Sequence, residues 1–139
     1  MAAGDDVSEA DVTRLRELRE ALRALAMANH RGQSPGTAPA EVIRRLSRGA
    51  ELSVAVDDTG RTTLAPIGQG VDGAVATLLS ILHEAQLSGD WSRMKGCRKC
   101  EYAFFDRSKN RSAAWCAMSI CGNRTKNRAY YRRRQSPST

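Results

Sequence analysis

The sequence predicts an α+β fold: a small, mainly helical N-terminal domain with one β-hairpin, followed by a second hairpin that holds four cysteines and a basic C-terminal helix. Three observations lead to this prediction. Leucines recur every three or four residues near the start of the chain, and the apolar period changes to two after residue 50. All four cysteines fall in the last third of the chain.

The N-terminal part is expected to form two helices before the hairpin. One apolar stripe predicts the first helix, over residues 8–29; it consists of Leu15, Leu18, Leu22 and Leu25. The turn-forming residues 33–39 separate it from a shorter helix over residues 40–48. Both helices present one apolar face, so we expect them to pack against a common core.

The period then changes from helical to alternating. Apolar residues at every second position predict a half-buried strand over 52–56, and Asp58-Thr59-Gly60 is a turn signal that predicts a returning strand over 62–67. A last N-terminal helix is expected over residues 71–88, with Gly89 as its C-terminal cap.

Charge divides the chain into two parts. Residues 1–90 hold 9 Lys or Arg and 13 Asp or Glu, whereas residues 91–139 hold 13 and 2, so the formal net charge of +7 comes from the C-terminal part. Such a part is expected to bind phosphate or another polyanion. Residues 1–11 lack an export signal, and no stretch approaches the roughly 20 apolar residues of a membrane span. We therefore expect a cytoplasmic protein without a membrane partner, associated with the nucleoid if it binds DNA.

The cysteines form two close pairs. Cys97 and Cys100 are separated by two residues, Cys116 and Cys121 by four, and fifteen residues lie between the pairs. Two tight turns that each supply two thiolates are typical of a closed, structural zinc site. An iron–sulfur cluster also takes four cysteines and stays an alternative, whereas the expected cytoplasmic location disfavours disulfides.

The segment between the pairs predicts a β-hairpin. Residues 101–105 would form one strand, residues 106–110 the turn and residues 112–116 the returning strand. Four aromatic side chains would form most of the small core, with the first of them the best candidate for exposure: Tyr102, Phe104, Phe105 and Trp115.

A basic helix is expected from Asn123 onward. Arg124, Arg128 and Arg132 would line one face with Asn123 and Asn127 beside them. Arg and Asn suit guanine and adenine edges, while Lys126 and Arg133 can neutralise phosphates. The alternatives are a solvated basic tail, or Arg124 held by Asp106 as a structural brace.

Several of these motifs together resemble the CGNR zinc-finger family: Trp91–Cys97, Cys100, Phe105–Ser108, Trp115-Cys116 and Cys121-Gly122-Asn123-Arg124. The resemblance covers residues 91–134. The resemblance implies that the four cysteines bind zinc and that the finger binds DNA. It also implies that the protein is a stress-induced transcription regulator, as members of this family are described. It also implies that a helical domain called ABATE precedes the finger. Residues 10–88 are similar in layout to the later part of that domain.

The sequence therefore predicts a zinc-dependent, DNA-binding transcriptional regulator. Residues 1–89 would be an ABATE-like regulatory or dimerisation domain, shortened at its start, residues 90–134 the CGNR zinc finger and residues 135–139 a disordered tail. One basic helix offers few base contacts, so we expect a homodimer. An RNA-binding zinc module and a protein-interaction adaptor are the alternatives. An enzyme is not expected, because no open metal position, no nucleophile with a base and no small-molecule site is evident.

Overall fold

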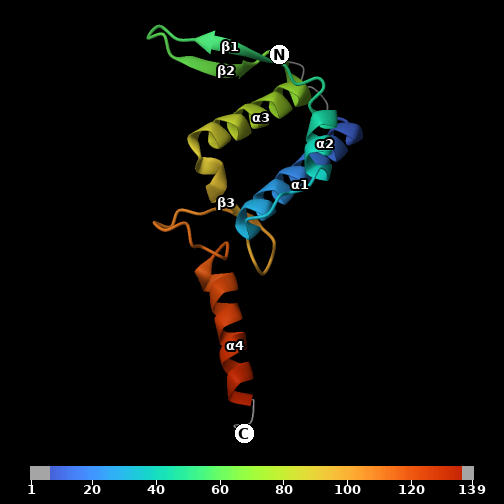
Figure 1. Cartoon of the computed structure of the whole chain (residues 1–139). Coiled ribbons are helices and arrows are strands. Elements are labelled where there is room, and N and C mark those ends of the chain that lie inside the picture. The colour runs from blue at the N-terminus through green and yellow to red at the C-terminus, as the bar shows by residue number, and fades with distance from the viewer. Residues whose placement is uncertain (1–6, 136–139) are drawn as a thin grey trace. The chain divides into compact units, whose positions relative to one another are not determined.

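The computed structural model describes residues 7–135 and confirms the α+β fold class: it contains helices and two short antiparallel hairpins, of which the first is the predicted one (Figure 1). The elements are α1 (Glu9–Arg31), α2 (Ala38–Leu46), β1 (Leu52–Val56), β2 (Thr62–Pro66), α3 (Gly70–Ser88), η1 (Asp90–Arg93), β3 (Met94–Gly96), β4 (Ala103–Phe105), η2 (Met118–Gly122) and α4 (Asn123–Gln135). Among residues 7–135, none of the helices combines the length and the apolar character that a membrane-spanning helix requires.

These elements form two compact units. The first takes the chain up to Leu25 together with Pro35–Trp91, and the second takes Ala26–Ser34 together with the residues from Ser92 onward. The last turns of α1 therefore group with the cysteine-containing part, whereas the sequence assigned them to the N-terminal domain. Of the predicted tail, Gln135 ends α4 and residues 136–139 lie outside the described residues.

Local signals place the helix ends. At the start of α1, the Asp11 N–H donates to Ser8 Oγ at 3.1 Å, while the Ser8 N–H donates to Asp11 Oδ2 at 3.0 Å. This reciprocal pair satisfies two backbone donors that a helix start leaves unpaired. At the end of α3, Gly89 adopts φ 82°, a left-handed conformation that glycine takes without a steric cost.

The core of the first unit joins its three helices. Leu18 of α1, Leu46 of α2 and Val75 of α3 are buried together, and half-buried side chains surround them: Leu15, Leu22, Val42, Ile43, Ala50, Val71 and Leu79. The Arg14 guanidinium donates to the Leu46 carbonyl at 3.1 Å and pairs with Asp72 Oδ1 at 2.6 Å. One side chain of α1 thus bonds to the C-terminal end of α2 and to the first turn of α3.

The first hairpin forms as predicted, but it is not half-buried as predicted. β1 and β2 pair antiparallel with Val54 opposite Leu64. Val54 and Val56 are 65% and 64% exposed, because α3 packs mainly against β2. Figure 1 shows β2 lying between β1 and α3. The alternating pattern correctly identifies the apolar positions of β1, but the tertiary packing leaves Val54 and Val56 exposed to solvent.

Replacing Leu18 by Ala should destabilise the first unit by about 2–5 kcal/mol, because it leaves a cavity where a side chain only 1% exposed joins three helices. Chemical denaturation followed by circular dichroism measures the change. Leu87→Ala is the matched control: Leu87 is 75% exposed on α3, so its truncation should change the unfolding free energy by less than about 0.5 kcal/mol. Equal effects of the two substitutions would contradict the assignment of this core.

Candidate metal centre and basic helix

The first cysteine pair lies in the turn of the second hairpin. β3 and β4 pair antiparallel, and Cys97 directly follows β3. The Cys97 N–H donates to the Tyr102 carbonyl at 2.9 Å, and the Glu101 N–H donates to the Cys97 carbonyl at 3.0 Å. These bonds close the chain into a tight turn, so Cys97 and Cys100 stand on one rigid piece of backbone.

The second pair lies where the chain enters α4. Cys121 belongs to η2, a π-helical turn in which the N–H groups of Ile120, Cys121 and Gly122 all donate to the Ala117 carbonyl, at 3.0–3.3 Å. A Cβ atom on Gly122 would lie 2.3 Å from the Met118 sulfur. A side chain at this position would therefore displace the flexible, 47% exposed side chain of Met118, which lies over Gly122.

The four sulfur atoms converge. Those of Cys97, Cys100, Cys116 and Cys121 all lie within 4.8 Å of one another. The Cys100–Cys116 and Cys116–Cys121 sulfur distances are 3.6 Å and 3.8 Å. Zinc–sulfur bonds of about 2.3 Å in a tetrahedron place neighbouring sulfurs about 3.8 Å apart. A disulfide needs about 2.05 Å, so all four cysteines are free thiols at the spacing of a tetrahedral metal site.

The protein environment shifts the pKa values of these thiols in different directions. Burial raises the pKa of Cys97, but backbone N–H groups of Cys100, Cys116 and Lys99 outweigh it and lower the pKa to about 6. Burial, together with the neighbouring sulfurs, raises the pKa of Cys121 to about 12 and also raises that of Cys116. Four sulfurs this close cannot all hold negative charge without a cation between them.

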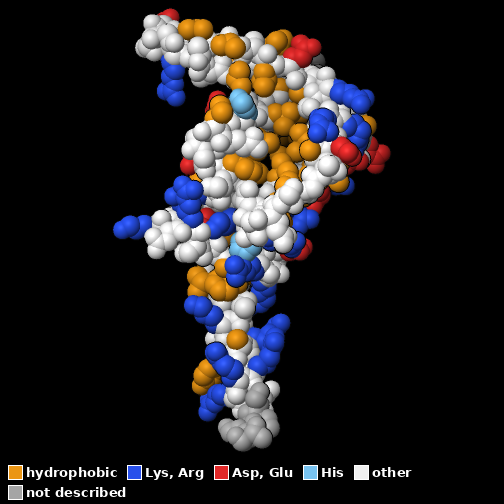
Figure 2. Space-filling model, viewed as in Figure 1, with side chains coloured by type: hydrophobic (Ala, Val, Ile, Leu, Met, Phe, Trp, Pro, Cys, Tyr) orange, Lys and Arg blue, Asp and Glu red, His pale blue; other side chains and the backbone are white. Residues whose placement is uncertain are grey.

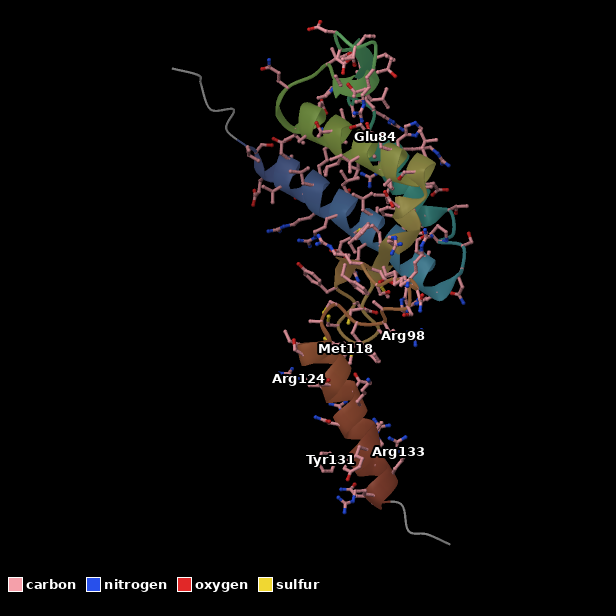
Figure 3. The ribbon with its side chains drawn as sticks, turned by 90° about the vertical axis from the view of Figure 1, so that its left-hand side faces the viewer. Glu84, Arg98, Met118, Arg124, Tyr131 and Arg133 are labelled. Carbon is pink, nitrogen blue, oxygen red and sulfur yellow. The ribbon has the colours of Figure 1, made fainter. Side chains whose placement is uncertain are left out.

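The predicted basic helix begins at Asn123, two residues after Cys121. All thirteen residues of α4 are exposed, and six of them are Lys or Arg with no acidic residue among them. Figure 2 shows blue side chains on both sides of α4. In Figure 3, Arg124 and Tyr131 project from one side of the helix and Arg133 from the other. Near its end, Tyr130 packs against Tyr131 and accepts a 3.1 Å hydrogen bond from Arg134.

Comparison with known protein families identifies both parts of the chain. Residues 93–134 match the family model described as "CGNR zinc finger", and residues 1–90 match ABATE, described as "Putative stress-induced transcription regulator". The chain belongs to the ABATE family and carries a CGNR zinc finger. No curated protein matches it. The match, with four cysteines close enough to bind one ion, establishes zinc as the cofactor in preference to an iron–sulfur cluster. The two family descriptions name a regulator and a zinc finger, and neither names an enzyme.

A buried carboxylate organises the loop between the cysteine pairs of the finger. Asp106 is 1% exposed, and its Oδ2 accepts hydrogen bonds from Lys95 Nζ at 2.7 Å and from the Ala113 N–H at 3.1 Å. Its Oδ1 accepts from the Ser108 N–H at 2.9 Å and from Ser108 Oγ at 2.6 Å. Burial raises the pKa of Asp106, but the bonds from Lys95 and Ser108 outweigh it and hold that pKa well below its ordinary value.

These bonds correct one expectation and exclude one alternative. The segment over residues 112–116 does not return as a strand, because β4 pairs with β3, and Asp106 and Lys95 instead hold the loop through Ala113 N–H and the Arg111 carbonyl. Among residues 7–135, Asp106 has Lys95 as its ionic partner, so the brace with Arg124 does not form. The Asp-x-Ser pattern predicts a local turn at Asp106; nothing in the sequence identifies Lys95 as its partner.

The aromatic core of the finger is smaller than expected. Phe104 and Trp115 are half-buried, but Tyr102 and Phe105 are 69% and 44% exposed. Exposure of Tyr102 agrees with the expectation, and exposure of Phe105 does not. A three-residue strand pair covers little area, so apolar burial alone stabilises this finger weakly.

The last turns of α1 pack onto the finger within the second unit. The Arg98 Nε–H donates to His30 Nε2 at 2.6 Å, and Asn29 Nδ2 donates to the Met94 carbonyl at 3.0 Å. A Cβ atom on Gly96 would collide with the Met27 sulfur, at 1.6 Å. Burial, with Arg98, Lys95 and Arg31 nearby, lowers the pKa of His30 and keeps it neutral at neutral pH. No motif in the sequence connects residues 26–34 with residues 94–98.

Asp106→Asn should weaken the finger, because it removes one charge of a buried pair and leaves Lys95 unpaired. We expect the free energy of unfolding to fall by about 3–5 kcal/mol and the affinity for zinc to fall with it. Denaturation of the zinc-loaded protein followed by tryptophan fluorescence, with zinc titration against a chelator, measures both. Asp58→Asn, in the exposed turn of the first hairpin, is the control and should change neither. Unchanged zinc affinity in Asp106→Asn would contradict the organising role of Asp106.

Proposed function

We propose that this protein is a zinc-dependent, DNA-binding transcriptional regulator. In this proposal Cys97, Cys100, Cys116 and Cys121 bind one zinc ion, and α4 contacts DNA. The observation that carries it is a helix with exposed residues throughout and six cationic side chains, which starts two residues after the last cysteine of a zinc finger. The family description of ABATE as a transcription regulator supports the same conclusion.

The zinc site serves to orient the helix. When bound, zinc neutralises part of the thiolate charge and fixes the two cysteine-bearing turns to each other. Because Cys121 lies in the turn that continues directly into α4, fixing its sulfur also fixes the direction in which α4 leaves the finger. Four thiolates and one divalent ion add a charge of −2, so residues 91–139 keep a net charge of about +9.

The distribution of charge around α4 favours a groove over a flat surface. At 3.6 residues per turn, Arg124, Arg128 and Arg132 lie within one face, while Lys126 and Arg133 lie on the opposite one. A flat anionic membrane reaches only one side of a helix, whereas the walls of a major groove present phosphates to several sides. We propose base contacts for the first face, with Asn123 and Asn127 beside it, and phosphate contacts for Lys126 and Arg133.

The domain assignment extends this proposal. Residues 1–89 would form the ABATE-like regulatory or dimerisation domain, and residues 90–134 the zinc finger. Residues 26–34 pack with the finger. The proposal therefore includes a structural contribution of α1 to the part that binds DNA.

RNA is the second candidate, because α4 also exposes aromatic side chains. Tyr130 and Tyr131 are 50% and 62% exposed, with ring centroids 5.7 Å apart. Exposed aromatic rings stack on unpaired bases, which is the usual basis of single-strand recognition. Competition between duplex DNA and structured RNA at fixed salt separates the two candidates. Protein partners that stay bound after nuclease treatment would favour the adaptor alternative over both.

Replacing Lys126 and Arg133 by Ala should weaken binding to every duplex sequence alike. If five phosphates are neutralised, log K against log salt slopes at about −4.5, and losing two contacts brings the slope to about −2.7. Fluorescence anisotropy over a salt series measures it. Arg44→Ala with Arg48→Ala removes the same charge from exposed positions of the first unit and should leave the slope unchanged. An identical slope in both double variants would contradict phosphate contact by α4.

Removing the metal should abolish DNA binding together with the order of the finger. Metal analysis should find one zinc per chain, and a variant with serine at all four cysteines should contain none and bind no DNA. Arg124→Ala with Arg128→Ala provides the contrast, since it should lose DNA affinity and keep its zinc. A four-serine variant that folds and binds DNA unchanged would overturn the proposal.

A further inference from the structure

The first hairpin leaves one strand edge unpaired. The Asp57 N–H donates to the Arg61 carbonyl at 3.0 Å, and the Ile67 N–H donates to the Glu51 carbonyl at 3.0 Å. Hydrogen-bonded and non-hydrogen-bonded pairs alternate along an antiparallel ladder. With Val54 opposite Leu64, the backbone groups of Leu52, Val54 and Val56 therefore point away from β2.

Nothing in the described part of the chain protects this edge. β1 pairs only with β2 in a two-stranded sheet, and Ser53, Val54, Ala55 and Val56 are all exposed. β1 contains no proline and no charged residue, which are the usual devices against edge pairing. The outer edge of β2 differs, because it ends in Pro66, which lacks an N–H, and β2 packs against α3.

The edge is complementary to itself. In a strand of five residues centred on Val54, a two-fold axis places Val54 opposite the partner's Val54, and Leu52 opposite the partner's Val56. All three positions carry outward-pointing N–H and C=O groups, so the three facing pairs would make six backbone hydrogen bonds. Apolar side chains would also face apolar side chains at every one of these positions.

We propose that two copies of this chain pair through β1, antiparallel about a two-fold axis at Val54, to form one four-stranded sheet. Because the axis stands perpendicular to the sheet, the apolar faces of both copies lie on the same side. Val54 and Val56, now 65% and 64% exposed, then gain the partner's side chains as neighbours. The inference rests on the hairpin alone, so it does not depend on what α4 binds.

The oligomeric state of the zinc-loaded full chain tests the proposal. Analytical ultracentrifugation at tens of micromolar should find a dimer. Val54→Lys places two like charges opposite each other and should raise the dimer dissociation constant at least about 100-fold. The control is Thr63→Lys, which adds the same charge on the opposite face of β2. That control should stay dimeric. Circular dichroism and zinc content should be unchanged in both variants, since both side chains are exposed.

The register has its own test. Val54→Lys and Val54→Glu should each be monomeric alone and should form a mixed dimer together at low salt, because the two-fold axis brings residue 54 of each copy together. A monomeric wild type, or a dimer that persists in Val54→Lys, overturns the proposal. Failure of the two monomeric variants to associate overturns the register. The salt series measures phosphate contact by α4 separately, so failure of the dimer and failure of the proposed DNA binding are distinguishable.

Discussion

The convergence of four sulfur atoms within 4.8 Å is the constraint on which the finger depends. Two turns separated by fifteen residues meet there, although the strand pair beside them is three residues long and much of the aromatic surface is exposed. So little apolar burial cannot offset the entropy of closing such a loop. The thiolate–metal bonds supply that free energy, and they give α4 a fixed starting point.

The surface charge of the finger depends on where its few acidic side chains lie and what they pair with. Residues 91–139 contain only two, Glu101 and Asp106. Asp106 is buried and neutralised by Lys95, so its charge organises the loop and does not reach the surface. The charged side chains that the finger exposes to solvent are consequently almost all cationic. The same ion pair that shapes the loop therefore leaves the six Lys and Arg side chains of α4 without a neighbouring charge from Asp106.

The first unit has a different character. Its net charge is negative, its core is aliphatic, and its hairpin extends beyond the cover that α3 provides. Two-stranded hairpins are marginal alone, because half of their backbone groups and one face depend on neighbours. The exposed edge of β1 is therefore able to pair with a further strand. Because its apolar residues stand at positions 52, 54 and 56, symmetrically about Val54, a second copy of the chain is the matching partner.

Local patterns determined much of this protein. The leucine spacing, the alternation over residues 52–56, the cysteine pairs and the basic run depend only on neighbours along the chain, and they predicted the helices, the first hairpin, the fold class and the cysteine set. Tertiary structure decided the rest. That β4 pairs with β3, that Lys95 neutralises Asp106, that His30 meets Arg98 and that Val54 stays in solvent all depend on groups distant in sequence. Such contacts leave no periodic pattern in the sequence, because they join residues that are far apart along the chain and that only the folded structure brings together.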